Sequence, residues 1–195
     1  MAMLNIVMFG APGSGKGTQS DMLITTYELF HISTGDVLRD NIKRGTDLGK
    51  TAKDYIDKGQ LIPDDLMTSI LASVVDEHAE EAKYGVIFDG FPRTIAQAEA
   101  LDKMLAERGT SISAVIGLDV PEEILVERLL LRGKESGRSD DNLETINDRL
   151  KVYHKSTAPL KEYYAEKGLL HMIKGTDTPI DVFDRIRAEL DPLAN

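Results

Sequence analysis

The chain has 195 residues, 42% of them hydrophobic, which is enough for one domain with a substantial core. It has no cysteine and a formal net charge of −10, so disulfides and thiolate metal sites are excluded, and a nucleic-acid partner held through its phosphate backbone is not expected. Neither a secretory signal nor an apolar run of membrane-spanning length is recognisable, and we expect a cytoplasmic protein without a membrane partner.

The first predicted strand, Leu4 to Phe9, leads directly into a glycine-rich segment that reads Gly-Ala-Pro-Gly-Ser-Gly-Lys-Gly-Thr at positions 10 to 18. Glycines let the backbone turn tightly and aim successive N–H groups at an anion, and the helix that follows adds the positive end of its dipole. Lys16 supplies a full charge for the outer phosphates of a nucleotide. The segment predicts a phosphate-binding loop; the alternative is an ordinary strand-to-helix turn.

This loop departs from the common pattern at one position. Gly17 follows Lys16, where the common loop has the Ser or Thr whose hydroxyl contacts magnesium. Thr18 comes one position later, so the pattern leaves open whether a loop hydroxyl binds the metal.

Four more short apolar runs rich in β-branched residues follow along the chain: Phe30–Ile32, Val86–Phe88, Ala114–Val120 and Leu169–Ile173. Segments with helical spacing separate them, such as the one that contains Leu66, Ile70 and Val74. Strands that alternate with helices predict an α/β fold in which a parallel sheet lies between helix layers, with right-handed crossovers.

Polar clusters follow the first three predicted strands. They begin at Gly10, at Ser33 (Ser-Thr-Gly-Asp) and at Asp89 (Asp-Gly-Phe-Pro-Arg). Because ligands of parallel α/β sheets gather at the carboxyl ends of the strands, we expect the three clusters to form one site.

Two segments do not fit a minimal alternation of strands and helices. Ser33 to Pro63 predicts two or three short helices, broken at Gly45 and Gly59, and Gly133 to Asp141 predicts a polar loop between two helices. Both lie next to the expected site and are interpreted as mobile flaps; plain surface excursions are the alternative.

Asp89 ends a predicted strand, which is where nucleotide enzymes with this loop have a second acidic motif. A carboxylate there can hold Mg²⁺ directly or through water. The alternative is a turn or helix-capping aspartate.

Arginines cluster around the polar loop. Arg128 and Arg132 are four residues apart in the preceding helix, Arg138 lies in the loop and Arg149 in the next helix, while Arg39 and Arg93 follow other strands. Guanidinium groups bind phosphate oxygens in pairs and keep their charge. The cluster therefore indicates phosphoryl transfer; ordinary surface pairs with neighbouring acids are the alternative. The four histidines (His31, His78, His154, His171) show no spacing typical of a catalytic or metal site, and we interpret them, with Tyr153, as structural.

Four segments together resemble the adenylate kinase family over essentially the whole chain. They are the loop at 10–19, Ser33–Arg39, Asp89–Thr94 and Gly137–Asp141. The short polar loop and the lack of cysteine match the short-lid form of the family, which has no zinc. The resemblance implies a P-loop NTPase-type three-layer fold with a five-stranded parallel sheet, and the reversible Mg²⁺-dependent reaction of ATP and AMP to give two ADP.

The resemblance also implies a division of the chain and a role for individual residues. The core would comprise 1–32, 63–130 and 142–195, with an NMP-binding flap at 33–62 and a lid at 131–141, in a monomer. ATP would be held by Gly13, Ser14, Gly15, Lys16, Gly17, Thr18, Arg128, Arg132 and Asp177. AMP would be held by Thr34, Arg39, Gln60, Leu61, Ile62, Gly90, Phe91, Pro92, Arg93, Gln97, Arg138 and Arg149. The catalytic set would be Lys16, Arg93, Arg128, Arg132, Arg138 and Arg149, with Mg²⁺ at Asp89 through water.

Two other functions remain open from the sequence. A pyrimidine monophosphate kinase would share the phosphate loop and the Gly-Phe-Pro-Arg segment, although Thr34 and Gln97 are the choices of an adenylate kinase. A regulatory module that senses ATP or ADP would share the fold but would not need the catalytic charges at Lys16, Asp89 and the lid.

Overall fold

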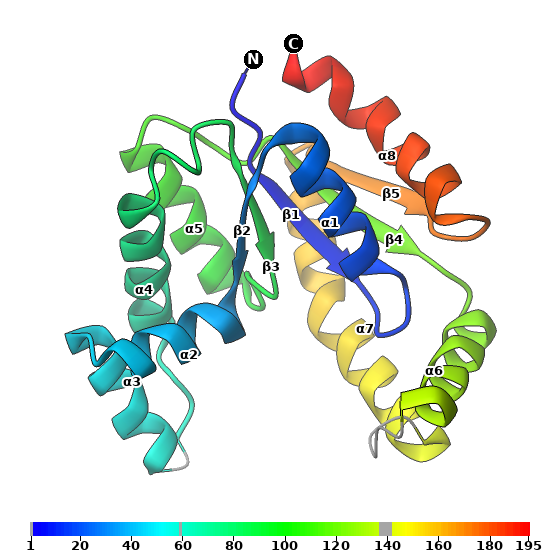
Figure 1. Ribbon diagram of the computed structural model, residues 1–195, viewed down its shortest axis with the longest axis horizontal. Coiled ribbons are helices and arrows are strands. Elements are labelled where there is room, and N and C mark those ends of the chain that lie inside the picture. The colour runs from blue at the N-terminus through cyan, green and yellow to red at the C-terminus, as the bar shows by residue number, and fades with distance from the viewer. Residues whose placement is uncertain (1, 59, 137–141) are drawn as a thin grey trace.

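The computed structural model describes residues 2–58, 60–136 and 142–195 and contains a five-stranded parallel sheet. The strands are β1 (Ile6–Gly10), β2 (Phe30–Ser33), β3 (Val86–Asp89), β4 (Ala114–Asp119) and β5 (Leu170–Lys174), in the order β2-β3-β1-β4-β5 (Figure 1). All five predicted strands are confirmed, and each end agrees with the prediction within two residues.

Helices cover both faces of the sheet, because both faces of its strands are apolar. In β1, Val7 and Phe9 pack into one hydrophobic cluster, and Ile6 and Met8 pack into another. The first cluster lies under α4 (Asp64–Glu77), α5 (Ile95–Glu107) and α7 (Leu143–Glu166); the second lies under α1 (Lys16–Tyr27) and α8 (Pro179–Ala194) (Figure 1). The predicted three-layer α/β fold is confirmed.

The segment after β2 forms two short helices, α2 (Thr34–Arg44) and α3 (Asp47–Asp57), as predicted. The break between them is at Gly45, which caps α2 in the left-handed conformation (φ 66°). The second predicted break, Gly59, lies outside the described residues. The two helices project from the carboxyl edge of the sheet. Helix α6 (Glu122–Ser136) lies at the same edge but on the other side of the molecule (Figure 1).

The prediction of a loop from Gly133 was wrong for its first residues, because helix α6 (Glu122–Ser136) continues through them. Leu125 and Leu129 anchor the helix in the core, and the Ser136 hydroxyl donates to the Arg132 carbonyl at 2.7 Å. A glycine inside a helix costs only about 1 kcal/mol relative to alanine, so Gly133 does not end it. Residues 137–141, which include Arg138, lie outside the described residues.

No helix among the described residues combines the length and the apolar character needed to cross a membrane.

Candidate functional site

The glycine-rich segment forms an open turn between β1 and α1. Gly13 and Gly15 adopt left-handed backbone conformations, with φ of 83° and 88°, which side chains with a Cβ rarely adopt. The residue that caps α1 is Gly15, which has no side chain to accept from the first N–H groups of this helix. The N-terminus of α1, with Lys16 as its first residue, can therefore bind an anion.

Contacts around the loop explain two of its glycines. A Cβ on Gly10 would lie 2.5 Å from the Ser14 hydroxyl oxygen, and a Cβ on Gly13 would lie 2.9 Å from Leu129 of α6. Ser14 is buried, and its hydroxyl has no hydrogen-bond partner among the described residues. The loop is thus packed tightly at Gly10 and Gly13, where a larger residue would not fit.

Lys16 lies beside Asp89 at the end of β3. Its ammonium group donates to the Asp89 carboxylate at 2.5 Å, and the other carboxylate oxygen lies 3.4 Å from His31 Nε2. The hydrogen bond with His31, followed by the hydrogen bond and charge of Lys16, lowers the pKa of Asp89 to about 2, although burial opposes the shift. The same contact with Asp89 raises the pKa of His31 above its usual value. Asp89 is therefore ionised at neutral pH.

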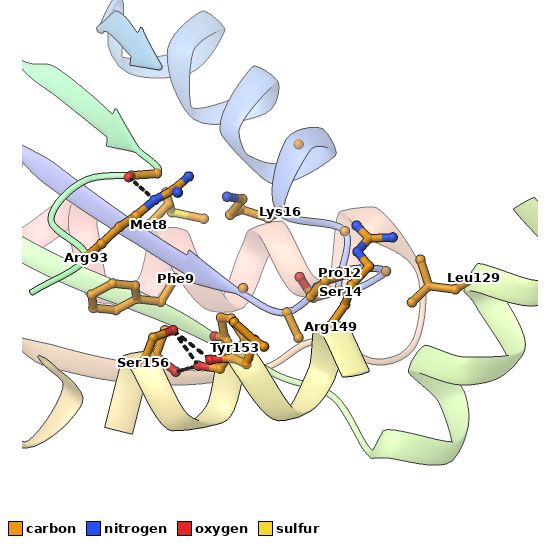
Figure 2. A pocket seen from close by; sticks show the side chains of 18 of the residues that line it. Met8, Phe9, Pro12, Ser14, Lys16, Arg93, Leu129, Arg149, Tyr153 and Ser156 are labelled. Atoms are coloured by element: carbon orange, nitrogen blue, oxygen red, sulfur yellow. Dashed lines mark hydrogen bonds between the residues drawn. The ribbon is translucent and has the colours of Figure 1, made fainter. Parts of the chain in front are cut away.

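An open cleft of about 1080 Å³ lies at the carboxyl edge of the sheet. It brings together the residues of the phosphate loop, the Gly90–Arg93 segment and Arg128, Arg132 and Arg149. Figure 2 shows Lys16, Arg93 and Arg149 approaching the cleft from three different elements, with Arg149 extending from α7 toward the phosphate loop. The predicted gathering of the first and third polar clusters is confirmed.

Two of these arginines are held by backbone carbonyls. Arg93 Nε donates to the Gly90 carbonyl at 2.9 Å, and Arg128 donates to the carbonyls of Gly13 and Gly175 at 3.3 and 3.5 Å. Arg128 therefore links the phosphate loop to the loop after β5. The acceptors in these contacts are neutral carbonyl oxygens, which do not neutralise the guanidinium charge. That charge favours a nearby anionic ligand.

Part of the predicted AMP set lies at one edge of this cleft. The Thr34 hydroxyl lies 3.4 Å from the Gly90 carbonyl, and the Gln97 side-chain oxygen accepts from the Arg93 backbone N–H at 2.7 Å. The second polar cluster, which begins at Ser33, is thereby placed beside the third. Arg39, on α2, instead forms a salt bridge with Asp36 and is exposed.

Three other predicted contacts, Leu61, Ile62 and Asp177, are not among the described residues that line the cleft. Leu61 is 94% exposed, whereas Ile62 packs against the core. Asp177 has a left-handed backbone (φ 81°), and its carboxylate accepts from Arg185 at 2.5 Å, which lowers its pKa. The Gly175 carbonyl that Arg128 contacts connects this loop with the phosphate loop.

The described residues contain no group of three or more side chains that could by themselves hold a metal ion. The residues present fit Mg²⁺, because this ion keeps several waters and is commonly bound by one or two carboxylates and the phosphates of a substrate. The ionised Asp89 next to the phosphate loop is such a carboxylate.

Tertiary structure adds residues that the sequence analysis missed. His31 contacts Asp89, Asp64 contacts Gln97 at 2.7 Å, and Tyr153 lines the cleft as well as packing on the core. Burial raises the pKa of Tyr153 to about 12. His31 and Asp64 lie 58 and 33 residues from their partners, so no local spacing could reveal them.

Comparisons with known proteins agree with this geometry. Residues 8–169 match the family model described as adenylate kinase. The chain is 62% identical to an adenylate kinase of Bacteroides fragilis over 98% of this chain and 100% of the relative. It is 60% identical to an adenylate kinase of Phocaeicola vulgatus over the same shares, and 52% identical to one of Porphyromonas gingivalis over 97% of this chain and 96% of that one.

Proposed function

The chain belongs to the adenylate kinase family of phosphotransferases, and from this premise we propose that it transfers a phosphoryl group reversibly from Mg²⁺-bound ATP to AMP, giving two ADP. The observation that carries the proposal is the convergence of Lys16, Arg93, Arg128, Arg132 and Arg149 on a cleft formed around the phosphate loop. A cleft with that lining suits two nucleotides held end to end through their phosphates.

ATP would place its phosphates on the loop of Gly13 to Thr18 and the N-terminus of α1. Lys16 would then exchange the Asp89 carboxylate, now 2.5 Å away, for phosphate oxygens. Asp89 would in turn bind water molecules of the Mg²⁺, an ion that neutralises charge on the phosphates when it is bound. Arg128 and Arg132 would act on the triphosphate, and the loop of Gly175 to Asp177 would contact its base.

AMP would enter between the α2–α3 flap and the Gly90–Arg93 segment. Arg39 and Arg93 would bind its phosphate, and Thr34, Gln97 and the Gln60–Ile62 segment would hold its base. The acceptor oxygen is already anionic, so no general base is needed. Catalysis then depends on alignment and on neutralising charge, which Arg149 and Arg138 would supply at the transferred group.

Closure of two flaps would exclude water, the competing acceptor. The NMP-binding flap would comprise residues 33–62 and the lid residues 131–141, of which 131–136 continue helix α6. We further propose that the enzyme is a cytoplasmic monomer.

Turnover with AMP, CMP and UMP, measured separately with ATP and Mg²⁺, tests the assignment of the acceptor. We expect AMP to be the preferred acceptor and ADP formation to require Mg²⁺. A preference for CMP or UMP would contradict the adenylate assignment and favour a pyrimidine monophosphate kinase.

A further inference from the structure

The Gln97 side-chain amide is held at both of its polar atoms. Its nitrogen Nε2 donates to the Asp64 carboxylate at 2.7 Å, and its oxygen Oε1 accepts from the Arg93 backbone N–H at 2.7 Å. Asp64 and Gln97 are both partly buried, so water competes only weakly for this contact.

These partners determine which way the amide faces. A carboxylate only accepts hydrogen bonds and a backbone N–H only donates them, so the nitrogen must face Asp64 and the oxygen must face Arg93. If the amide were rotated by 180°, its oxygen would face the Asp64 carboxylate, which is also an acceptor, and its nitrogen would face the Arg93 N–H, which is also a donor. The nitrogen has a second N–H and the oxygen has a second lone pair. The amide therefore presents one donor and one acceptor to a ligand, in a fixed order.

Helix capping does not account for the Asp64 contact. The backbone N–H of Gln97 is already capped by the Thr94 hydroxyl at 3.1 Å, and that bond needs nothing from the Gln97 side chain. Asp64 is the first residue of α4, and its neighbour Asp65 shares the favourable position at the helix N-terminus but is exposed. Of the two carboxylates, it is that of Asp64 that contacts Gln97.

We propose that Asp64 is a positioning residue that orients the Gln97 amide for recognition of the base of the monophosphate substrate. This inference rests on the proposed function, in which Gln97 contacts the AMP base. Adenine offers an amino donor beside a ring-nitrogen acceptor, whereas hypoxanthine, of the same size, offers a carbonyl acceptor beside an N–H donor. A fixed amide matches the first order and opposes the second, so Asp64 sets the preference for AMP over IMP.

The test compares Asp64→Ala with the matched control Asp65→Ala, which removes the same charge from the same helix turn. For Asp64→Ala we expect the KM for AMP to rise about tenfold, and the ratio of kcat/KM for AMP to that for IMP to fall by a similar factor, since a charge-assisted hydrogen bond is lost. The KM for ATP should stay unchanged. Asp64→Asn keeps an acceptor and should restore part of the AMP preference, and Asp65→Ala should match the wild type.

A double-mutant cycle shows whether Asp64 acts through Gln97. In a Gln97→Ala background, the additional Asp64→Ala change should leave the KM for AMP and the AMP-to-IMP ratio unaltered. Any of three results would overturn the positioning role. Asp64→Ala could still change these values in the Gln97→Ala background, it could have the same effect as Asp65→Ala, or it could lower the KM for AMP. If the wild-type enzyme makes no ADP from ATP and AMP, the proposed function itself is wrong. If the wild-type enzyme turns over normally, a negative result contradicts only the positioning role of Asp64.

Discussion

Lys16 and Asp89 form a short ion pair at the place where the phosphates of ATP are expected. Their side chains are 29% and 21% exposed, so the pair is only partly screened by solvent. In the proposed mechanism a nucleotide competes with Asp89 for the lysine, and it would bring several phosphate charges together with Mg²⁺, whose waters the released carboxylate would bind. The pair therefore keeps the lysine ordered and beside the loop before substrate binds.

Replacing Lys16 by methionine keeps the length of the side chain and removes its charge. We expect turnover to fall by about a hundredfold or more, because one preorganised group that stabilises transition-state charge is lost. The far-UV circular dichroism spectrum should remain that of the wild type. Steady-state kinetics of ADP formation measures the effect, and unchanged activity would contradict the proposed mechanism.

A hydrogen bond links α1 to α8, in which the Tyr27 hydroxyl donates to the Asp191 carboxylate. Burial, followed by this hydrogen bond, raises the pKa of Tyr27 to about 12 from an ordinary value near 10. The folded state therefore holds the proton more tightly than the unfolded state. The resulting stabilisation is complete below about pH 10 and is lost as the pH rises through about 12.

Tyr27→Phe should lower the free energy of unfolding by about 1.5 kcal/mol at pH 8, which is typical of a hydrogen bond to a charged group. The difference between wild type and variant should shrink as the pH is raised from 9 to 11. Urea unfolding at each pH measures this, and a difference that stays constant or grows would contradict the role of the Tyr27 proton.

Helices α2 and α3 cross closely, and a glycine makes the contact possible. A Cβ on Gly49 would lie 2.2 Å from the Asn41 carbonyl oxygen, far inside contact distance. Asn41 is itself buried, and its side-chain oxygen accepts from the Thr46 hydroxyl at 2.9 Å, so the backbone there has little room to move. The geometry of the proposed flap thus depends on Gly49.

Gly49→Ala should destabilise the α2–α3 pair by about 1–3 kcal/mol, the usual cost of overpacking. Because the pair belongs to the proposed AMP side, the KM for AMP should rise more than the KM for ATP. Lys50→Ala, on the exposed face of the same helix, is the matched control. Thermal unfolding and the two KM values measure the effect; a stability equal to that of Lys50→Ala would show that the backbone shifts without cost.

The whole molecule combines a net charge of −10 with a cleft whose lining, within the described part of the chain, holds five cationic side chains and one acidic one, Asp148. The excess of negative charge therefore lies outside the cleft. Such a distribution keeps the protein apart from other polyanions while it attracts small phosphorylated ligands to one place. Two nucleotides held end to end in this cleft, as we propose, would have their phosphates near Lys16 and the arginines.

A dinucleotide of two adenosines joined through their phosphates should bind one per chain and occupy both halves of the site. Calorimetry should give a stoichiometry of one for this ligand, and the Tm should rise as its concentration exceeds the Kd. Bound ATP should prevent its binding, and so should bound AMP. A chain that binds one nucleotide at saturation, with no second site, would contradict the two-substrate arrangement.

Much of the fold and of the site could be predicted from local patterns. The phosphate loop and the five strands depend on neighbouring residues, since glycine spacing and apolar runs act within a few residues of the backbone they shape. The prediction of a loop at 133–136 was wrong because it relied on local composition alone. Polar composition there indicated a loop, but helix α6 continues because its preceding turns are anchored in the core.

The partnerships within the site depended on the folded chain. Lys16 with Asp89, Asp89 with His31 and Gln97 with Asp64 join residues that lie 73, 58 and 33 positions apart. Parallel strands with helical crossovers bring such residues to one sheet edge, but which side chains then touch depends on packing and register across several elements. Residue types and their local spacing were therefore enough to identify the chemistry, whereas the choice of partners required the three-dimensional arrangement.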